Sequence, residues 1–425
     1  MKKLFSNDAF AVLKVENFRF FLAFRSFITM ATLMQSVVVG WQIYSLTKNV
    51  LSLGIIGLTE VIPQVSIALF AGHFVDLWDR KKIISYTSFI LMFGSLLLLM
   101  YSIPSFNCYK HFGTFPIYIA IFLTGLTRGI MMPANTAFLG QLVPRELYGN
   151  AATWNSANWQ IAAVLGPAFG GLIYGFFGII PAYITVFLFY LLAYVLLMKV
   201  NSTSAFIVAE NVENIFIRIR EGIRYVFNNK LLLGAFSLDM FAVFFGGAVA
   251  MLPAFASDIL KVGPEGLGLL RASPAVGAII MSVVLMFYPP VKDTGKKLFI
   301  CVTGFGICMI SFALSHSFYL SVIILVFSGV FDSVSVVIRA TILQLFTPHE
   351  IRGRVAAVNS IFIGSSNELG AFESGLAAKI MGLVPSVIFG GAITLLVVAV
   401  TSIVSPALRK LSLKEGGLLY NQEKS

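Results

Sequence analysis

Charged residues are scarce in this chain, which has 425 residues, 12% of them charged and 58% hydrophobic. Soluble domains carry roughly 25% charged residues, so this share is too low to cover a water-exposed surface of such a size. The mean hydropathy of +0.89 supports the same conclusion. The composition excludes an ordinary soluble protein and indicates a chain whose surface mostly faces lipid.

Cysteine and histidine are also few, with three and four residues respectively. Cys301 and Cys308 lie in an apolar run and are interpreted as packing residues, whereas Cys108 lies in a short polar loop. The histidines lack the spacing of metal ligands. No nucleophile–base arrangement or phosphate-binding loop is recognisable. We therefore expect neither an enzyme nor a metal site, and no cofactor.

Long apolar runs, by contrast, are abundant. A helix needs about 20 predominantly apolar residues to cross a bilayer. Twelve runs meet this requirement: 17–46, 51–75, 83–104, 115–141, 150–175, 179–199, 231–260, 266–289, 297–316, 319–346, 353–382 and 384–406. The sequence therefore predicts an all-α membrane protein with twelve transmembrane helices.

The basic residues predict how these helices are oriented. With both termini in the cytoplasm, 22 Lys and Arg residues lie on the cytoplasmic side, and five of the 30 fall inside spans. The outer side holds the remaining three, Lys48, Lys110 and Lys261. This distribution follows the positive-inside rule. The net charge of +11 is therefore explained by topology and contact with anionic lipid, not by nucleic-acid binding.

Part of the sequence occurs twice. Residues 144–181 match residues 348–385 at a constant offset of 204, with twelve identities over 38 positions. The shared residues are mostly glycines, prolines and small polar residues. Such a duplication in an apolar chain is typical of transporters built from two similar halves. We predict two six-helix bundles of parallel topology around a central cavity, at 1–199 and 231–406, with a linker at 200–230 and a cytoplasmic tail at 407–425.

The linker contains a segment with one apolar face. Phe216, Ile219, Ile223 and Val226 recur at helical spacing, with basic residues on the opposite side. This pattern predicts a helix that lies in the membrane interface. A soluble helix packed beneath the bundles would show the same pattern.

Between the second and third spans, residues 72–82 combine Gly72 and Asp76 with a basic cluster that begins at Arg80. This arrangement resembles the loop signature of the major facilitator superfamily. Two positions depart from the common form: Leu77 stands where a basic residue is usual, and Asp79 where glycine is usual. A fainter copy occurs at 292–297 in the second half.

The signature has a physical purpose. Gly72 allows close packing, and Asp76 can interact with a helix N-terminus or a basic partner so that one transport state is held closed. A plain positive-inside stop signal would explain the basic residues but not Gly72 and Asp76.

The fifth span contains Gly166, Pro167, Gly170 and Gly171, which resemble the Gly-Pro-x-x-Gly-Gly motif of export-type superfamily members. Proline bends a helix, and glycines open a groove for a neighbouring helix. Over essentially its whole length the chain resembles the bacterial branch that includes the enterobactin exporter and the transmembrane secretion effectors. The resemblance implies export across the inner membrane, driven by a proton gradient, by a protein expected to be a monomer.

Ionisable residues within the spans are costly and usually functional. Carboxylates that could carry protons are Glu60, Asp239, Glu368, Glu373 and Asp332. Residues that could line the cavity or gate it are Arg25, Gln35, Arg128, Asn135, Asn155, Asn158, Arg339 and Asn359. Glu60 and Asp239 rank first among the proton carriers because no basic residue lies near either one in its own span. Each of these residues could instead belong to a structural network.

The expected function is therefore export of a small amphipathic molecule, such as a siderophore or a drug-like compound, in exchange for protons. The alternative is a proton-independent facilitator or a lysophospholipid flippase of the same fold. The substrate itself is not encoded in any motif that the sequence displays.

Overall fold

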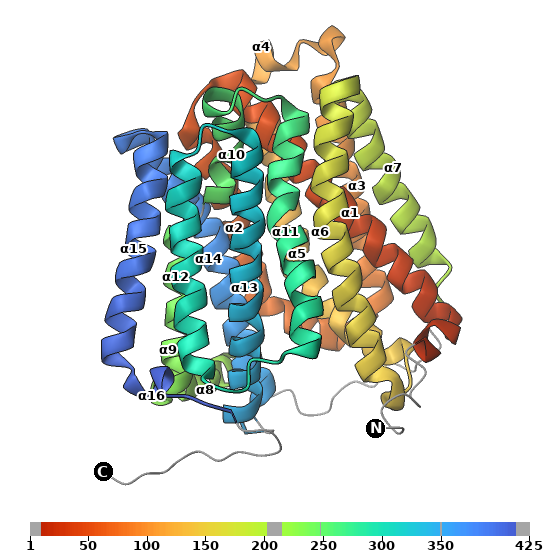
Figure 1. The fold of residues 1–425 in the computed structure, drawn as a ribbon. Coiled ribbons are helices and arrows are strands. Elements are labelled where there is room, and N and C mark those ends of the chain that lie inside the picture. Colours follow the sequence, from red (N-terminus) through yellow and green to blue (C-terminus); the bar gives the residue numbers. More distant parts are fainter. Residues whose placement is uncertain (1–9, 202–214, 247, 349–350, 414–425) are drawn as a thin grey trace. The chain divides into compact units, whose positions relative to one another are not determined.

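The apolar runs of the sequence become long helices (Figure 1). The computed structural model describes residues 10–201, 215–246, 248–348 and 351–413, and within these ranges every regular element is a helix. The helices of the first half are α1 (Glu16–Thr47), α2 (Val50–Leu77), α3 (Arg80–Ser102), α4 (Cys108–Phe112), α5 (Phe115–Leu142), α6 (Tyr148–Phe177) and α7 (Ile179–Met198).

The second half begins with α8 (Ile215–Asn228) and continues with α9 (Lys230–Phe245), α10 (Leu252–Ala254), α11 (Pro264–Phe287), α12 (Thr294–Leu314), α13 (Phe318–Phe346), α14 (Arg352–Met381), α15 (Leu383–Val404) and α16 (Pro406–Arg409). Helix α8 occupies the described part of the predicted linker, and the rest of the linker, 202–214, lies outside the described residues.

The chain forms two compact units. Unit 1 comprises residues 1–48, 58–212 and 262–272, and unit 2 comprises 49–57, 213–261 and 273–425. The division falls inside α2 and α11, so each unit contains the beginning of one helix from the opposite half of the sequence. The two bundles predicted from the repeat therefore do not coincide fully with these units.

Eleven helical segments in the described ranges are long and apolar enough to cross a membrane. The predicted eleventh span corresponds to α14, a continuous helix of 30 residues. Its sequence contains five charged residues, which lowers its hydropathy: Arg352, Arg354, Glu368, Glu373 and Lys379. Together these segments account for the twelve spans predicted from the sequence.

The sequence repeat is also a structural repeat. Helices α6 and α14 each have 30 residues, and both their first and last residues are 204 positions apart. Gly178 and Gly382 end them with φ of 91° and 94°, a conformation that residues other than glycine rarely adopt. Each glycine N–H donates to a carbonyl four residues earlier at 3.0 Å. The duplicated glycines therefore fix where the two equivalent helices end.

The predicted span 231–260 is not one regular helix. Helix α9 ends at Phe245, and the chain continues as a 3₁₀ helix (Ala248–Met251), the short α10, and a π-helical segment (Phe255–Ile259). Gly246 follows the break, and a side chain there would meet the ring of Phe305 at 2.7 Å. Pro253 adds a residue that cannot donate a backbone hydrogen bond. Apolar composition alone could not reveal this interruption.

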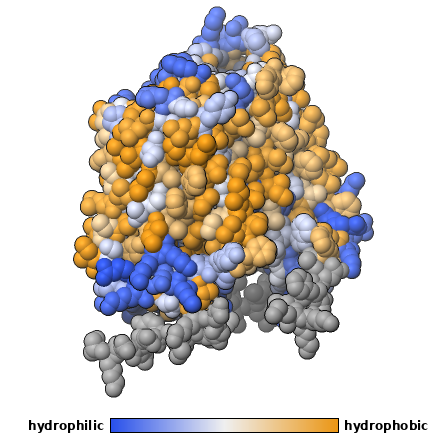
Figure 2. Space-filling model, viewed as in Figure 1, coloured by the Kyte–Doolittle hydropathy of each residue, from blue (hydrophilic) through white to orange (hydrophobic). Residues whose placement is uncertain are grey.

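Each unit has its own apolar interior. In unit 1, Phe21 packs edge-on against Phe138 with 5.6 Å between ring centroids, and both are buried. In unit 2, the buried core includes Leu232, Ile338 and Val355 from α9, α13 and α14. On the face seen in Figure 2, apolar side chains cover the sides of α12, α13 and α15, while hydrophilic residues gather near their ends. This is the distribution expected of membrane-spanning helices.

The loops contain structure that the sequence did not predict. Asp79, which replaces the usual glycine of the loop signature, caps α3 by accepting hydrogen bonds from the backbone N–H groups of Lys81 and Lys82 at 2.8 and 3.3 Å. Lys81 Nζ also donates to the carbonyl of Met198 at the end of α7, at 3.2 Å. The predicted polar loop around Cys108 is largely helical, because Cys108 begins α4.

Candidate functional site

A cluster of charges centred on a buried ion pair lies between α9 and α13 of unit 2. Asp239 on α9 forms an ion pair with Arg339 on α13, and only 7% of each residue is exposed. Arg339 Nη2 lies 3.9 Å from Oδ1 of Asp332, whose side chain is half exposed. The Arg339 Nε donates to the carbonyl of Ser335 at 3.2 Å. One guanidinium thus serves two carboxylates, and a single added proton would make the cluster neutral.

A small cavity adjoins this cluster. Asp239, Asp332 and Ser335 line it together with apolar side chains that include Phe305 and Phe331, and its volume is about 20 Å³. A water molecule needs roughly 10–15 Å³ measured in this way, so the cavity can hold about one water. The cavity is too small for an organic substrate but large enough for a water that carries a proton to a carboxylate.

A second ion pair joins α2 and α5 in unit 1, between Glu60 and Arg128. The packing of the two helices explains how these residues meet. Gly125 of α5 lies directly against the backbone of Glu60, and Gly129 lies against that of Gln64, so the helices approach more closely than side chains would permit. The Glu60 side chain is 15% exposed and that of Arg128 is 43% exposed.

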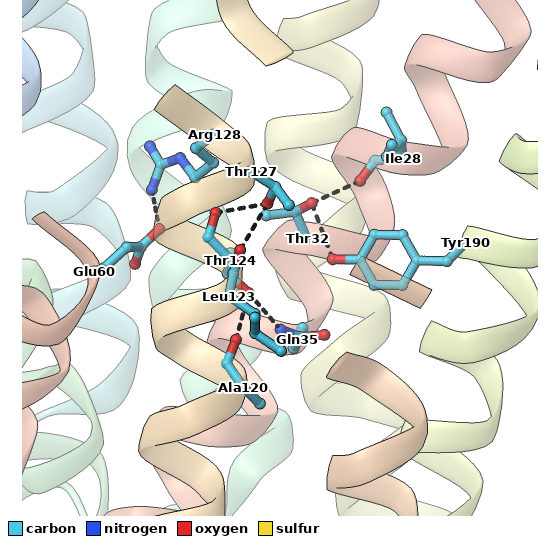
Figure 3. A network of polar contacts seen from close by, with 10 residues as sticks. All are labelled: Ile28, Thr32, Gln35, Glu60, Ala120, Leu123, Thr124, Thr127, Arg128 and Tyr190. Atoms are coloured by element: carbon cyan, nitrogen blue, oxygen red, sulfur yellow. Dashed lines mark hydrogen bonds and ion pairs between the residues drawn. The ribbon is translucent and has the colours of Figure 1, made fainter. Parts of the chain in front are cut away.

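Hydrogen bonds between helices lie beside this pair, on the other side of α5 in Figure 3. Gln35 Nε2 on α1 donates to Thr124 Oγ1 on α5 at 3.2 Å. Tyr190 on α7 donates to Thr32 Oγ1 on α1 at 3.1 Å, and the Thr32 hydroxyl in turn donates to a backbone carbonyl. Unit 1 therefore contains several polar contacts between helices, from side chains of α1, α2, α5 and α7; together these are called the polar region of unit 1.

Two amides in unit 1 are incompletely bonded. Gln35 Oε1 and both amide atoms of Asn135 are buried without a hydrogen-bond partner among the described residues. A buried polar group that makes no hydrogen bond costs about 1–3 kcal/mol, so such groups are uncommon in folded proteins. Asn135 lies seven residues after Arg128 on α5, so the two share one helix face. These amides are therefore suited to bind a polar ligand or water.

The glycine motif of α6 has two distinct faces. Gly166 and Gly170 pack against α1, where an added Cβ would lie 2.9 Å from Leu33 and 3.0 Å from the Met34 backbone. Gly171 instead faces Gly268 of α11, with 2.6 Å between an added Cβ and the Gly268 Cα. Pro167 is a buried residue in the interior of the same helix.

The second copy of the repeat makes the equivalent contact. Gly375, aligned with Gly171, packs against Gly54 at the beginning of α2, and an added Cβ would lie 2.6 Å from the Gly54 Cα. Gly171 thus contacts the beginning of α11 within unit 1, and Gly375 contacts the beginning of α2 within unit 2. Each of these helix beginnings comes from the opposite half of the sequence to most of its unit. The duplicated glycines thus serve a common purpose, whereas aligned positions Arg128 and Asp332 carry opposite charges.

The remaining candidates lie outside these two clusters. Asn158 on α6 accepts a hydrogen bond from Ser26 on α1 and donates to the carbonyl of Leu22 at 3.4 Å. The others on helices are partly buried: Arg25, Asn155, Asn359, Glu368 and Glu373. The loop-signature residues Gly72 and Asp76 belong to α2 and Arg80 to α3, and the Asp76 side chain lies outside the described part of the chain.

Sequence reasoning did not find the partners in these pairs. Glu60 and Asp239 have no basic neighbour in their own spans, yet each pairs with an arginine from another helix. Thr124, Tyr190 and Ser26 also take part although no motif marked them. Their only signal was polarity within an apolar run, since contacts between helices are not encoded in local spacing. Within the described ranges, no three His, Cys, Asp or Glu side chains are grouped so that they could hold a metal ion.

Comparison with known proteins identifies relatives of this chain. The family described as transmembrane secretion effector matches residues 7–415. The staphyloferrin A transporter of Staphylococcus aureus is 21% identical over 387 residues, which cover 88% of this chain and 92% of that protein. The MFS-type transporter YkuC of Bacillus subtilis is 26% identical over 204 residues, and the match spans 46% of this chain and 45% of the relative, less than half its length.

Shorter similarity extends to an ion exchanger. A Na(+), Li(+), K(+)/H(+) antiporter of Planococcus maritimus is 25% identical over 124 residues, 28% of each chain. Among solved structures, a POT family transporter in complex with 5-aminolevulinic acid has a TM-score of 0.73 at 12% identity, covering 92% of this chain and 96% of that one. A bacterial homologue of the iron transporter ferroportin has a TM-score of 0.69 at 15% identity, covering 94% and 100%. At these identities the structures are evidence of a shared fold.

Proposed function

Since the chain belongs to the transmembrane secretion effector family of membrane transporters, we propose that it exports a small amphipathic molecule in exchange for protons. The predicted family and the all-helical transporter fold are confirmed, and the protein is not an enzyme. Direction, coupling ion and substrate are the proposed parts. The proposal places the protein in the inner membrane of a bacterium, with both termini in the cytoplasm, as a monomer that works by alternating access.

The cluster formed by the buried pair Asp239–Arg339 and the half-exposed Asp332 carries the proton-coupling part of this proposal. Two carboxylates share one guanidinium in surroundings that are otherwise apolar, and a cavity with room for about one water reaches them. An unpaired charge costs free energy in such surroundings. A carboxylate that separates from Arg339 is therefore favoured to take up a proton. Buried carboxylates at bilayer depth are typical of proton relays in transporters. The partial similarity to a cation/proton antiporter agrees with this role.

The polar region of unit 1 supports binding of an organic substrate. Arg128 is partly exposed beside Glu60, and the buried amides of Gln35 and Asn135 have unused hydrogen-bonding capacity. Acceptor oxygens of an amphipathic molecule would bind Arg128 and the Asn135 amide N–H, while a hydroxyl or N–H group of the same molecule would donate to Gln35 Oε1. The name of the S. aureus relative makes a siderophore the first substrate class to test.

The direction of transport rests on the motif in α6. Gly166, Pro167, Gly170 and Gly171 resemble the motif of export-type transporters, and three of the four pack without side chains against α1 or α11. We propose that these contacts make a tight seal that resists back-leak while a proton gradient is used for export.

The test combines identification of the substrate with measurement of coupling. A deletion strain is compared with its parent for retained metabolites and for drug sensitivity. Compounds that accumulate are then presented to proteoliposomes that contain the purified protein and a pH-sensitive dye. We expect substrate-driven proton flux, which Asp239→Asn abolishes and Glu60→Gln reduces. Glu16→Gln, at the exposed beginning of α1, is the matched carboxylate control and leaves the flux unchanged.

If substrate crosses the membrane with no proton flux, the protein is a facilitator or a lysophospholipid flippase and the antiport proposal fails. If flux is present and persists in both Asp239→Asn and Glu60→Gln, transport is proton-coupled but these carboxylates are not its carriers.

A further inference from the structure

An open groove runs along the outside of α12 in unit 2, in contact with α15, α13 and α16. Its volume is about 580 Å³. Ile300, Thr303 and Ile307 of α12 line one side, and Val398 and Ser402 of α15 line the other. The floor is the ring of Phe331, which fits because Gly304 has no side chain: an added Cβ would lie 2.7 Å from that ring. The groove is therefore an apolar channel formed by the packing of three helices.

One end of the groove is strongly basic. Lys296 from the first turn of α12 and Arg409 from α16 line it, and both are exposed. Lys296 lies 3.0 Å from Asp293, but both side chains are more than 60% exposed, at 64% and 61%. Exposed ion pairs contribute little free energy, so the contact with Asp293 leaves Lys296 able to bind another anion. The basic end therefore has room for one additional negative group.

Backbone contacts bring these two cations together. The N–H of Gly295 donates to the carbonyl of Leu411 at 2.9 Å, and the N–H of Leu413 donates to the carbonyl of Val291 at 2.8 Å. The absence of a side chain at Gly295 is required here, because the carbonyls of Leu408 and Arg409 occupy the space that a Cβ would take. The segment that follows α15 is thus tied to the loop that precedes α12, and Arg409 is positioned beside Lys296.

The length of the groove matches one leaflet of a bilayer. Lys296 and Ile307 are 11 positions apart on one helix, which corresponds to about 16 Å at a rise of 1.5 Å per residue. Half of a bilayer's hydrocarbon core is about 15 Å thick. The distribution of basic residues predicts that the Lys296 end lies at the cytoplasmic surface, where anionic lipids concentrate. Figure 2 shows hydrophilic residues gathered at the α16 end of this face, with apolar residues beyond them.

We propose that this groove binds an anionic phospholipid of the cytoplasmic leaflet. The phosphate lies between Lys296 and Arg409, and an acyl chain lies along Ile300, Thr303 and Ile307 over the ring of Phe331. The two charges select an anionic head group over a zwitterionic one, and the apolar walls select a lipid over a free anion. Basic pockets at the cytoplasmic ends of membrane helices are known to hold such head groups.

The test is lipid titration of the purified full-length protein in detergent, followed by native mass spectrometry. Phosphatidylglycerol and phosphatidylcholine with the same acyl chains are compared. We expect preferential retention of phosphatidylglycerol, with about fivefold weaker binding for each removed cation, from roughly 1 kcal/mol per basic residue. The combined variant Lys296→Gln with Arg409→Gln is therefore expected to bind about 25-fold more weakly. Size-exclusion chromatography checks that each variant remains folded.

Two further measurements make the test specific. Arg220→Gln with Lys230→Gln removes the same number of charges from exposed positions of unit 2 that do not line the groove, and it should leave phosphatidylglycerol binding unchanged. Thr303→Trp fills the apolar part and should weaken binding of both lipids while both cations remain.

Retention of phosphatidylglycerol by the Lys296→Gln, Arg409→Gln protein at native strength would overturn the proposal. Unchanged lipid binding by Thr303→Trp would overturn it too, since the acyl chain would then lie elsewhere. Displacement of phosphatidylglycerol by excess inorganic phosphate would identify a free-anion site and would also reject it. Loss of binding in the cation and Thr303 variants, with phosphate ineffective, supports it. None of these outcomes depends on transport.

Discussion

Asp239 of α9 and Arg339 of α13 form an ion pair at which both residues are almost fully buried. Their positions are 100 residues apart in the sequence, yet the apolar faces of the two helices enclose them in the core of unit 2. Burial of two charges costs free energy, and only close pairing of the charges offsets this cost. The pair is therefore tolerated as a unit, and the costs of removing its two members should not be additive.

This expectation can be measured as a double-mutant cycle. Arg339→Gln should lower the free energy of unfolding by about 3–5 kcal/mol, since it leaves the buried Asp239 without its partner. Asp239→Asn should cost less, because Arg339 keeps its second carboxylate, Asp332. The double variant should lose less than the sum of the two. Chemical unfolding of the purified protein in detergent supplies the numbers. Simple additivity would mean that the two side chains are not energetically coupled.

The Glu60–Arg128 pair should behave differently. Arg128 is 43% exposed but its partner Glu60 is only 15% exposed, so Arg128→Gln should cost about 1–3 kcal/mol of unfolding free energy, less than Arg339→Gln. Transport should nevertheless fall strongly, because we assign Arg128 to substrate contact. The measurement is transport by the same stable preparation, with Arg145→Gln at the exposed beginning of the α5–α6 connection as the control. A large loss of stability in Arg128→Gln would show that the residue is mainly structural.

Gly171 and Gly149 lie on the same helix and should respond to alanine with opposite signs. At Gly171 a Cβ would meet the backbone of Gly268 at 2.6 Å, so Gly171→Ala should cost about 1–3 kcal/mol. At Gly149 no atom lies within 4 Å, so Gly149→Ala should be neutral or stabilise by about 0.5 kcal/mol through the unfolded state. Thermal unfolding in detergent compares the two. Equal shifts would contradict the tight contact between α6 and α11.

The native cysteines offer a test of topology. Cys108 is partly exposed at the beginning of α4, whereas Cys301 and Cys308 are buried in α12, and all three are free. With the proposed orientation, a membrane-impermeant maleimide should label intact spheroplasts at Cys108, and Cys108→Ser should remove that label. Labelling that appears only after the membrane is opened would place this loop in the cytoplasm and reverse the proposed topology.

The sequence predicted the helices and their repeat but not the contacts between helices. Composition and hydrophobic run length identified the spans because a bilayer imposes one length on every crossing helix. The repeat predicted α6 and α14, since Gly178 and Gly382 stop both helices by the same backbone conformation. These features are local, so local patterns suffice to find them.

The pairing of charges required the structure. Glu60 and Asp239 have no basic neighbour in their own spans, and their arginine partners are 68 and 100 residues away in the sequence. The break after Phe245 was missed for a related reason. The apolar run continues through it, and the close packing of Gly246 against Phe305 involves another helix, so local sequence does not reveal it.

The tie between the chain after α15 and the loop before α12 has a practical consequence for engineering the protein. Residues 405–413 would ordinarily be taken for a dispensable end, and a truncation after the last long helix would be the obvious choice. That cut would remove the carbonyl of Leu411 and the N–H of Leu413, which hold Gly295 and Val291. A truncation or a fused reporter should therefore begin beyond Leu413, so that the hydrogen bonds to the loop before α12 are kept.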